Sequence, residues 1–255
     1  MRPARWGRRA RAAVRERLAD PPIHARRKKG LQLTTRIATR RGRPPRPELA
    51  ASRREQILVQ ATREFARRGY HATDVQELAD ELELGKGTVY RYFPSKGALF
   101  LAAVDRVMLL LRERIDAVRA RAADPLDQIA EAMTVYLAFF DAHPEFVELL
   151  IQERAVFRDR KKPTYFEHRE RNSGRWQALY RELMDAGRVR PMPPATISAV
   201  LSSALYGTMF TNFFAGRSKS LEDQAADLLD VVFHGILTEP ERARRRAGRP
   251  TRVNP

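Results

Sequence analysis

The chain has 255 residues, no cysteine and a net charge of +17, with 48 Lys and Arg against 31 Asp and Glu. The lack of cysteine excludes disulfides, thiolate metal sites and cysteine-based redox sensing. No run approaches the roughly 18 apolar residues that a membrane helix needs, and the N-terminus shows no signal-peptide apolar core, so we expect a soluble, cytoplasmic protein.

The positive charge is concentrated at the two ends. Residues 1–47 hold 16 Lys and Arg against 2 Asp and Glu, and residues 240–255 hold 6 against 1. Both segments have few large apolar residues, so we expect a disordered basic arm and a disordered basic tail. The residues between them are close to neutral, and residues 48–96 hold 8 basic and 8 acidic side chains.

The arm ends in Arg41-Gly42-Arg43-Pro44, which resembles the core of an AT-hook. Arginines on an extended, glycine-containing backbone can lie in a narrow minor groove, where negative potential is concentrated. Two other interpretations stay open. In the first, the arm is a solvated basic tail that makes non-specific contacts with phosphates. In the second, residues 1 to about 40 result from a start codon that was assigned too far upstream.

Helical periodicity begins after the arm. Ile57, Ala61 and Phe65 share one helix face, and Gly69 is expected to end that helix. A second apolar face follows over residues 75–82. We expect Thr73 to cap this helix and Gln76, three residues later, to complete a capping box.

A short aromatic and basic helix comes next, behind a glycine turn. It reads Gly87-Thr88-Val89-Tyr90-Arg91-Tyr92-Phe93-Pro94-Ser95-Lys96. The second of two helices that cross at a short turn is the one that can enter a major groove of DNA. The sequence therefore predicts three helices on one small core, with the last helix reading DNA.

This series in register, over residues 53 to about 100, resembles the tetracycline-repressor (TetR/AcrR) family of bacterial transcription regulators. The resemblance implies an all-α fold. A three-helix helix-turn-helix DNA-binding domain would span residues 48–97, and a helical ligand-binding and dimerisation domain would span residues 98–239. It also implies that Thr88, Tyr90, Arg91 and Tyr92 face the groove and that Lys96 holds a phosphate.

The physical chemistry of these side chains agrees in type, because hydroxyls bind phosphates or base edges and arginine can take guanine bidentately. For Tyr90 the alternative is burial in the three-helix core, and for Gln76 it is the capping box. The candidate DNA-binding residues are Arg41, Arg43, Thr73, Gln76, Lys86, Thr88, Tyr90, Arg91, Tyr92 and Lys96.

Six further helices are expected in the second domain, with Ser95 capping the first of them and a polar linker over residues 158–163. They span about 96–121, 126–141, 144–157, 165–186, 195–215 and 221–237. Aromatic and methionine side chains on these helices are compatible with an apolar ligand pocket, although core packing explains them equally well. The candidate ligand-binding residues are Met108, Tyr136, Phe139, Phe140, Phe157, Trp176, Tyr180, Met209 and Phe213.

The last two helices carry apolar faces that need a partner. In the family, such helices pair with their copies as a four-helix bundle; intramolecular burial is the alternative. The candidate interface residues are Val200, Leu201, Ala204, Leu205, Thr208, Leu228, Leu229, Val232, Phe233 and Ile236.

Signs of catalysis are weak. The five histidines are scattered, no phosphate-binding glycine loop or metal motif appears, and Glu148 with Glu153 and Glu167 with Glu170 look like ordinary solvated charges. We expect no enzyme activity, metal or cofactor. The prediction is a homodimeric regulator that represses from a palindromic operator and responds to a small apolar or amphipathic ligand. The alternative is a ligand-independent architectural protein that binds DNA through its basic arms.

Overall fold

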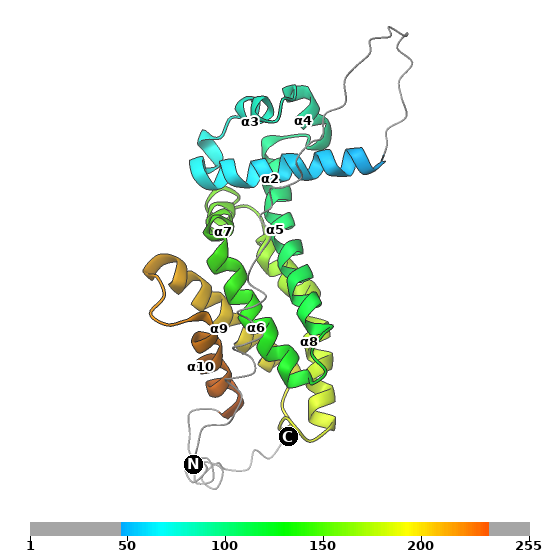
Figure 1. The fold of residues 1–255 in the computed structure, drawn as a ribbon, viewed down its shortest axis with the longest axis vertical. Helices are drawn as coiled ribbons and strands as arrows, with labels where there is room; N and C mark the ends of the chain where they lie inside the picture. Colours follow the sequence, from blue (N-terminus) through cyan, green and yellow to red (C-terminus); the bar gives the residue numbers. More distant parts are fainter. Residues whose placement is uncertain (1–46, 235–255) are drawn as a thin grey trace, which may run out of the picture. The chain divides into compact units, whose positions relative to one another are not determined.

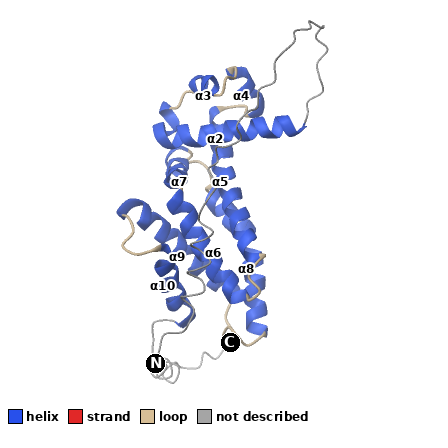
Figure 2. Ribbon diagram, viewed as in Figure 1, coloured by secondary structure: helices blue, strands red, loops and turns tan. Residues whose placement is uncertain are grey.

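The computed structural model describes residues 47–234, and Arg41, Arg43 and Ile236 lie outside this range. Within it the chain forms helices joined by loops, with no strand (Figure 2). The helices are α2 (Pro47–Ala72), α3 (Val75–Glu81), α4 (Lys86–Tyr92), α5 (Lys96–Arg119), α6 (Pro125–Ala142), α7 (Pro144–Val156), α8 (Thr164–Asp185), α9 (Pro194–Ala215) and α10 (Leu221–His234). None of these helices is long and apolar enough to cross a membrane. The all-α prediction is confirmed.

Local sequence signals explain most helix ends. Gly69 leaves the helical conformation at φ 80°, so the regular part of α2 ends there although helical turns continue to Ala72. Such a positive φ favours glycine, which has no Cβ to clash. The Ser95 hydroxyl accepts the Ala98 N–H at 3.0 Å and caps α5 as predicted.

The described residues group into two compact units. One comprises residues 47–113 with 143–171, and the other comprises residues 114–142 with 172–234. Helices α5 and α8 contribute to both units, so these units do not divide the chain at residue 97, where the sequence placed a domain boundary.

In the first unit, α3 and α4 lie together on one side of α2 (Figure 1). An aromatic cluster joins the end of α2 to α5 and α7: the Phe65 and Phe100 ring centroids are 5.0 Å apart, and those of Phe100 and Phe157 are 5.4 Å apart. Gln152 on α7 donates to the Phe65 carbonyl at 2.9 Å. These contacts hold the helix-turn-helix segment against α5 and α7 within this unit.

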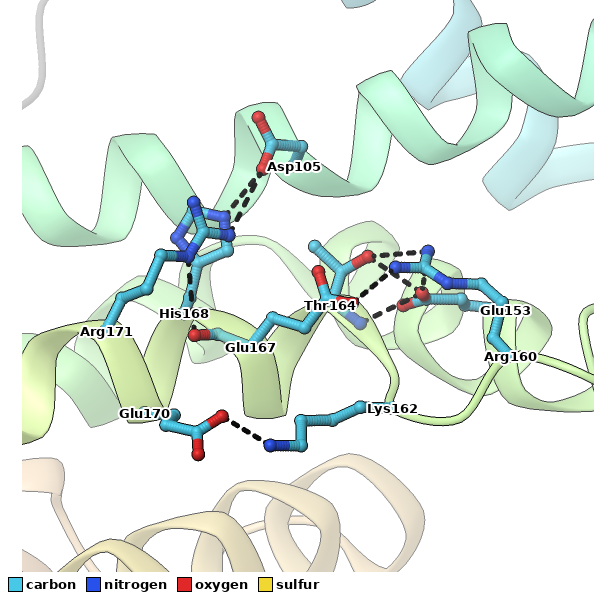
Figure 3. A network of polar contacts seen from close by, with 9 residues as sticks. All are labelled: Asp105, Glu153, Arg160, Lys162, Thr164, Glu167, His168, Glu170 and Arg171. Carbon is cyan, nitrogen blue, oxygen red and sulfur yellow. Dashed lines mark hydrogen bonds and ion pairs between the residues drawn. The ribbon is translucent and has the colours of Figure 1, made fainter.

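The segment between α7 and α8 is organised by a buried carboxylate (Figure 3). Glu153 is 1% exposed, and its Oε1 accepts the Thr164 N–H at 2.9 Å, the Thr164 hydroxyl at 2.7 Å and Arg160 Nη1 at 2.7 Å. Arg160 also binds Glu167 at 3.0 Å. The expectation that Glu153 is a solvated charge was therefore wrong, because three donors on the following segment converge on it.

The core of the second unit is a cluster from α6, α8 and α9, consisting of Ile129, Met133, Leu179, Tyr180, Leu183 and Leu201. Helix α6 packs against both α9 and α10. The side-chain amides of Asn212 and Gln224 exchange two hydrogen bonds, at 2.8 and 3.1 Å, and so join α9 to α10. The apolar faces of the last two helices are thus covered in part within the same unit.

Candidate nucleic-acid interface

The turn between α3 and α4 sets the orientation of α4. Glu83 has φ 55°, an uncommon value for a residue with a side chain. The Glu83 and Leu84 N–H groups bond back to the Asp80 and Ala79 carbonyls at 2.9 and 2.8 Å. The left-handed residue of this turn is therefore Glu83, whereas Gly85 has an ordinary φ of −75° and serves as the N-cap of α4.

The start of α3 differs from the predicted capping box. Asp74 is the N-cap, and its Oδ1 accepts the Gln76 N–H at 2.7 Å. The Thr73 hydroxyl is buried and donates toward the Gly69 carbonyl at 2.8 Å, closing the turn from α2. Gln76 Nε2 binds Asp80 Oδ1 at 2.7 Å. The capping-box prediction was wrong. The Thr73 hydroxyl stabilises this turn and is buried, so it is not exposed to DNA.

Helix α4 has one buried and one exposed face. Val89 and Phe93 are buried in the three-helix core, while Tyr90 and Arg91 are exposed. The alternative that Tyr90 belongs to the core is excluded by its exposed fraction of 37%. Thr88 and Tyr92 are half-buried at the border between the two faces. An exposed aromatic and a guanidinium next to each other on a short helix match what a base-reading surface needs.

Arg91 differs from the nearby Lys86 and Arg68 in its ion pairing. Its guanidinium carbon lies 5.7 Å from the centroid of the Tyr92 ring, and it forms no ion pair with any residue in 47–234. Lys86 Nζ, in contrast, lies 3.7 Å from Asp74 Oδ1, and Arg68 pairs with both Glu64 and Glu77. The Arg91 guanidinium is therefore available to form hydrogen bonds with a base edge.

The Lys96 side chain contacts the end of α2. Its Nζ donates to the His71 carbonyl at 3.0 Å and lies 5.0 Å from the centroid of the Tyr70 ring. Burial lowers the pKa of Lys96, and the charge of Asp74 opposes that shift. These contacts give Lys96 a role in holding α5 to the end of α2.

A residue that the sequence reasoning missed is Arg54 in the second turn of α2. Its guanidinium carbon lies 5.1 Å from the centroid of the Phe93 ring, next to the C-terminal end of α4. The adjacent pair Arg53-Arg54 at the start of the first helix was the available signal. An exposed arginine at this place suits a phosphate beside the groove that α4 would enter.

The predicted ligand-binding residues are divided between the two units. Met108 and Phe157 belong to the first unit, where Phe157 packs on Phe100, and the other seven belong to the second. In the second unit the Tyr136 hydroxyl lies 3.6 Å from Met209 Sδ, and its ring packs on Phe140. Burial raises the pKa of the Tyr180 hydroxyl. Phe139 is buried, whereas Trp176 and Phe213 are half-buried.

The predicted interface residues divide into two sets. Five of them pack onto the core of their own unit, which is the intramolecular alternative: Leu201, Leu205, Leu228, Leu229 and Val232. Ala204 and Thr208 are half-buried, and Val200 and Phe233 are exposed. The exposed stripe of α9 instead contains Val200, Ser203, Gly207, Thr211 and Phe214. The assignment of these residues to a dimer interface stays a prediction, with half of the set at least partly covered by its own unit.

The exposed arginine and tyrosine of α4 lie on a helix-turn-helix with its own core, an arrangement typical of DNA-binding domains. Residues 57–103 match the model of the family described as "Bacterial regulatory proteins, tetR family". Over this segment the chain is similar to the tetR family. The resemblance seen in the sequence is confirmed.

Two curated relatives illustrate the range of similarity. The uncharacterized HTH-type transcriptional regulator YuxN of Bacillus subtilis is 31% identical over 104 residues, which cover 40% of this chain and 36% of YuxN. The HTH-type transcriptional activator FasR of Mycolicibacterium smegmatis is 37% identical over 118 residues, or 46% of this chain and 52% of FasR. The chain thus matches about a third to a half of each relative's length. Other relatives are named transcriptional repressors.

Solved structures agree with the fold along most of the described chain. The transcriptional regulator FadR from Bacillus subtilis, solved in complex with stearoyl-CoA, has a TM-score of 0.62 and 16% sequence identity. The match covers 72% of this chain and 99% of FadR. At this identity the likeness shows the fold, a helix-turn-helix domain followed by a helical domain.

Proposed function

We propose that the protein is a homodimeric repressor that binds a palindromic operator through two copies of the α3–α4 unit. The observation that carries this proposal is the exposed pair Tyr90 and Arg91 on α4, backed by the buried Val89 and Phe93. The buried pair fixes the rotation of the helix, so the exposed pair points away from the core. Lys86 and Arg54 supply flanking positive charge for phosphates.

Dimerisation through the exposed stripe of α9 would bring two such units onto one DNA. Val200 and Phe214 are 56% and 70% exposed, and small side chains between them allow a second helix to come close. A two-fold axis through such a contact makes the interface self-complementary and the operator palindromic.

The effector in this proposal is a small apolar or amphipathic molecule bound by the second unit. Support comes from the match of residues 57–103 to the tetR family and from the aromatic and sulfur-containing side chains of α6 and α9, such as Tyr136, Phe140 and Met209. Binding of the effector would lower the affinity for the operator.

Selection of binding sites from random DNA, followed by affinity measurements on the selected site, tests the proposal. Arg91→Ala should relax the base preference at one position of each half-site, at a cost of about 1–3 kcal/mol. Arg54→Ala is the matched control, because loss of a phosphate contact should weaken all sequences alike. An unchanged site profile for Arg91→Ala would remove that residue from base reading.

A second function is favoured by the charge of +14 on residues 1–47, which exceeds what a helix-turn-helix needs. An architectural protein would bind DNA through this arm with little preference for sequence. A repressor should prefer its operator over random DNA by roughly a thousandfold or more at physiological salt. Deletion of residues 1–47 should flatten the slope of log affinity against log salt by about 0.9 per lost phosphate contact, while leaving that preference in place.

A further inference from the structure

Arg91 lies against the ring of the next residue along the chain. Its guanidinium carbon is over the Tyr92 ring, 5.7 Å from the centroid, in the last turn of α4. Neighbouring residues of a helix are about 100° apart around its axis, so their side chains do not face each other. The contact therefore requires the Arg91 side chain to fold sideways over the tyrosine rather than extend straight away from the helix.

The backbone on both sides of Tyr92 is fixed. Val89 and Phe93 are buried, and the Phe93 N–H donates to the Val89 carbonyl at 3.0 Å as the C-cap of α4. Pro94 disfavours a helical conformation at Phe93, which is extended with φ −136° and ψ 106°. Tyr92 is half-buried beside this anchor, whereas Arg91 is exposed. The tyrosine ring is thus the more restrained partner of the pair.

The residue after Tyr92 makes the same kind of contact with a second arginine. The Arg54 guanidinium carbon on α2 lies over the Phe93 ring, 5.1 Å from its centroid. Two consecutive aromatic residues at the end of α4 therefore each present a ring to a guanidinium, one from α4 itself and one from α2. These rings restrain both of the arginines to which the proposed function assigns DNA contacts.

The contact with Tyr92 leaves the hydrogen-bonding edge of Arg91 open. The N–H bonds of a guanidinium lie in its plane, so a ring against one face does not use them. Arg91 also forms no ion pair with any residue in 47–234. A guanine offers its N7 and O6 atoms to such an edge in the major groove.

Restraint before binding affects how sharply an arginine selects a base. A freely rotating arginine loses side-chain freedom when a base fixes it, and that loss opposes binding. A guanidinium already held over a ring loses less, and it has fewer orientations in which to reach a wrong base. An exposed contact between a cation and a ring changes an equilibrium by about two- to fivefold, or about five- to thirtyfold for the two copies on a palindrome.

We propose that Tyr92 is a positioning residue for base recognition by Arg91. Its ring holds the guanidinium so that the open edge of Arg91 meets a guanine in one orientation, and its hydroxyl is not needed for this. The inference rests on the proposed function, because it names the residue that sets how sharply Arg91 selects its base in the operator complex.

Equilibrium binding to two DNA duplexes tests this role. One duplex carries the operator selected by the wild-type protein, and the other has A·T in both half-sites at the base pair where Arg91→Ala relaxes the preference. The ratio of the two dissociation constants, at one salt concentration, measures the discrimination at that base pair. Tyr92→Leu should lower this ratio by about five- to thirtyfold, because the ring is lost. Tyr92→Phe keeps the ring and should keep the ratio within about twofold of the wild type.

The double variant Arg91→Ala/Tyr92→Leu separates positioning from direct contact. If Tyr92 acts through Arg91, its replacement should not lower the ratio further once Arg91 is alanine. Tyr90→Leu is the matched control, because it removes the other tyrosine next to Arg91, whose ring contacts no cation in residues 47–234. Its ratio at this base pair should equal that of the wild type. Circular dichroism verifies folding, and Tyr92→Met replaces Tyr92→Leu if the leucine variant does not fold.

Three outcomes overturn the positioning role: an undiminished ratio in Tyr92→Leu, equal losses in Tyr92→Leu and Tyr92→Phe, or a further loss when Tyr92→Leu is added to Arg91→Ala. If Arg91→Ala relaxes no base pair, Arg91 does not read a base and the positioning role fails with it. In each of these cases a preferred operator leaves the DNA-binding function standing. If the wild type prefers no DNA sequence, the proposed function itself fails.

Discussion

Replacement of Glu153 should be among the most destabilising single changes in the first unit. Its Oε1 accepts from the Thr164 N–H, the Thr164 hydroxyl and Arg160, and both Glu153 and Thr164 are buried. Glu153→Ala leaves these donors without their acceptor. Loss of one partner of a buried ion pair costs about 3–5 kcal/mol.

Glu153→Gln separates the charge from the hydrogen bonds. An amide oxygen can still accept from Thr164, while the attraction to Arg160 is lost, so we expect a smaller cost of about 1.5–3 kcal/mol. Glu170→Ala is the control in the same network, because Glu170 pairs with Lys162 at the surface. An exposed pair of this kind contributes little to stability, because solvent screens it.

Urea unfolding monitored by circular dichroism measures these differences, with the wild type and the three variants at one protein concentration. For a chain of this size, 3–5 kcal/mol corresponds to a fall in Tm of about 6–20 °C. Should Glu153→Ala and Glu170→Ala prove equally stable, the carboxylate of Glu153 does not organise the segment between α7 and α8.

Three other predictions follow from single contacts. Glu83→Gly should raise the free energy of unfolding by about 0.5–1 kcal/mol, because Glu83 has φ 55° and glycine adopts that conformation without strain. Glu83→Ala is the control: it removes the charge but keeps the strain, so its melting temperature should not rise above that of the wild type. Lys96→Met should cost about 1 kcal/mol of stability, because it loses the hydrogen bond to the His71 carbonyl and the contact with Tyr70. If Tm is unchanged and DNA binding is weakened, Lys96 contacts a DNA phosphate instead. Phe214→Arg should give a folded monomer by light scattering, and an intact dimer would move the interface off the exposed stripe of α9.

The sequence predicted the helices well where a single residue decides the boundary. Proline opens α6, α7 and α9, because it lacks the N–H that the first turn does not need. Gly69 and Ser95 mark their boundaries through backbone conformation and side-chain capping. These signals are local, so they can be read without knowing what lies across the fold.

The errors share one cause, which is that the partner of a side chain is set by tertiary packing. Periodicity showed that Leu201 and Leu205 lie on an apolar face, but it does not tell whether a second chain or the same chain covers that face. Glu153 has helix neighbours like those of any surface glutamate, and its burial depends on a segment that begins after α7 ends. Asp74 rather than Thr73 caps α3 because the Thr73 hydroxyl is used by the preceding turn.

The electrostatics of the helix-turn-helix explain how an almost neutral unit can select a sequence. Arg67 and Arg68 pair with Glu64, Arg68 also reaches Glu77, and Lys86 lies near Asp74, so much of the positive charge is offset by carboxylates of the same unit. Such offsets weaken the attraction to any phosphate, which depends on net charge. Arg91 keeps its charge unpaired at the surface, and in the proposed operator complex it binds a base edge rather than a phosphate. In this proposal selectivity depends on α4, and the basic residues outside the helix-turn-helix strengthen binding without altering the preferred sequence.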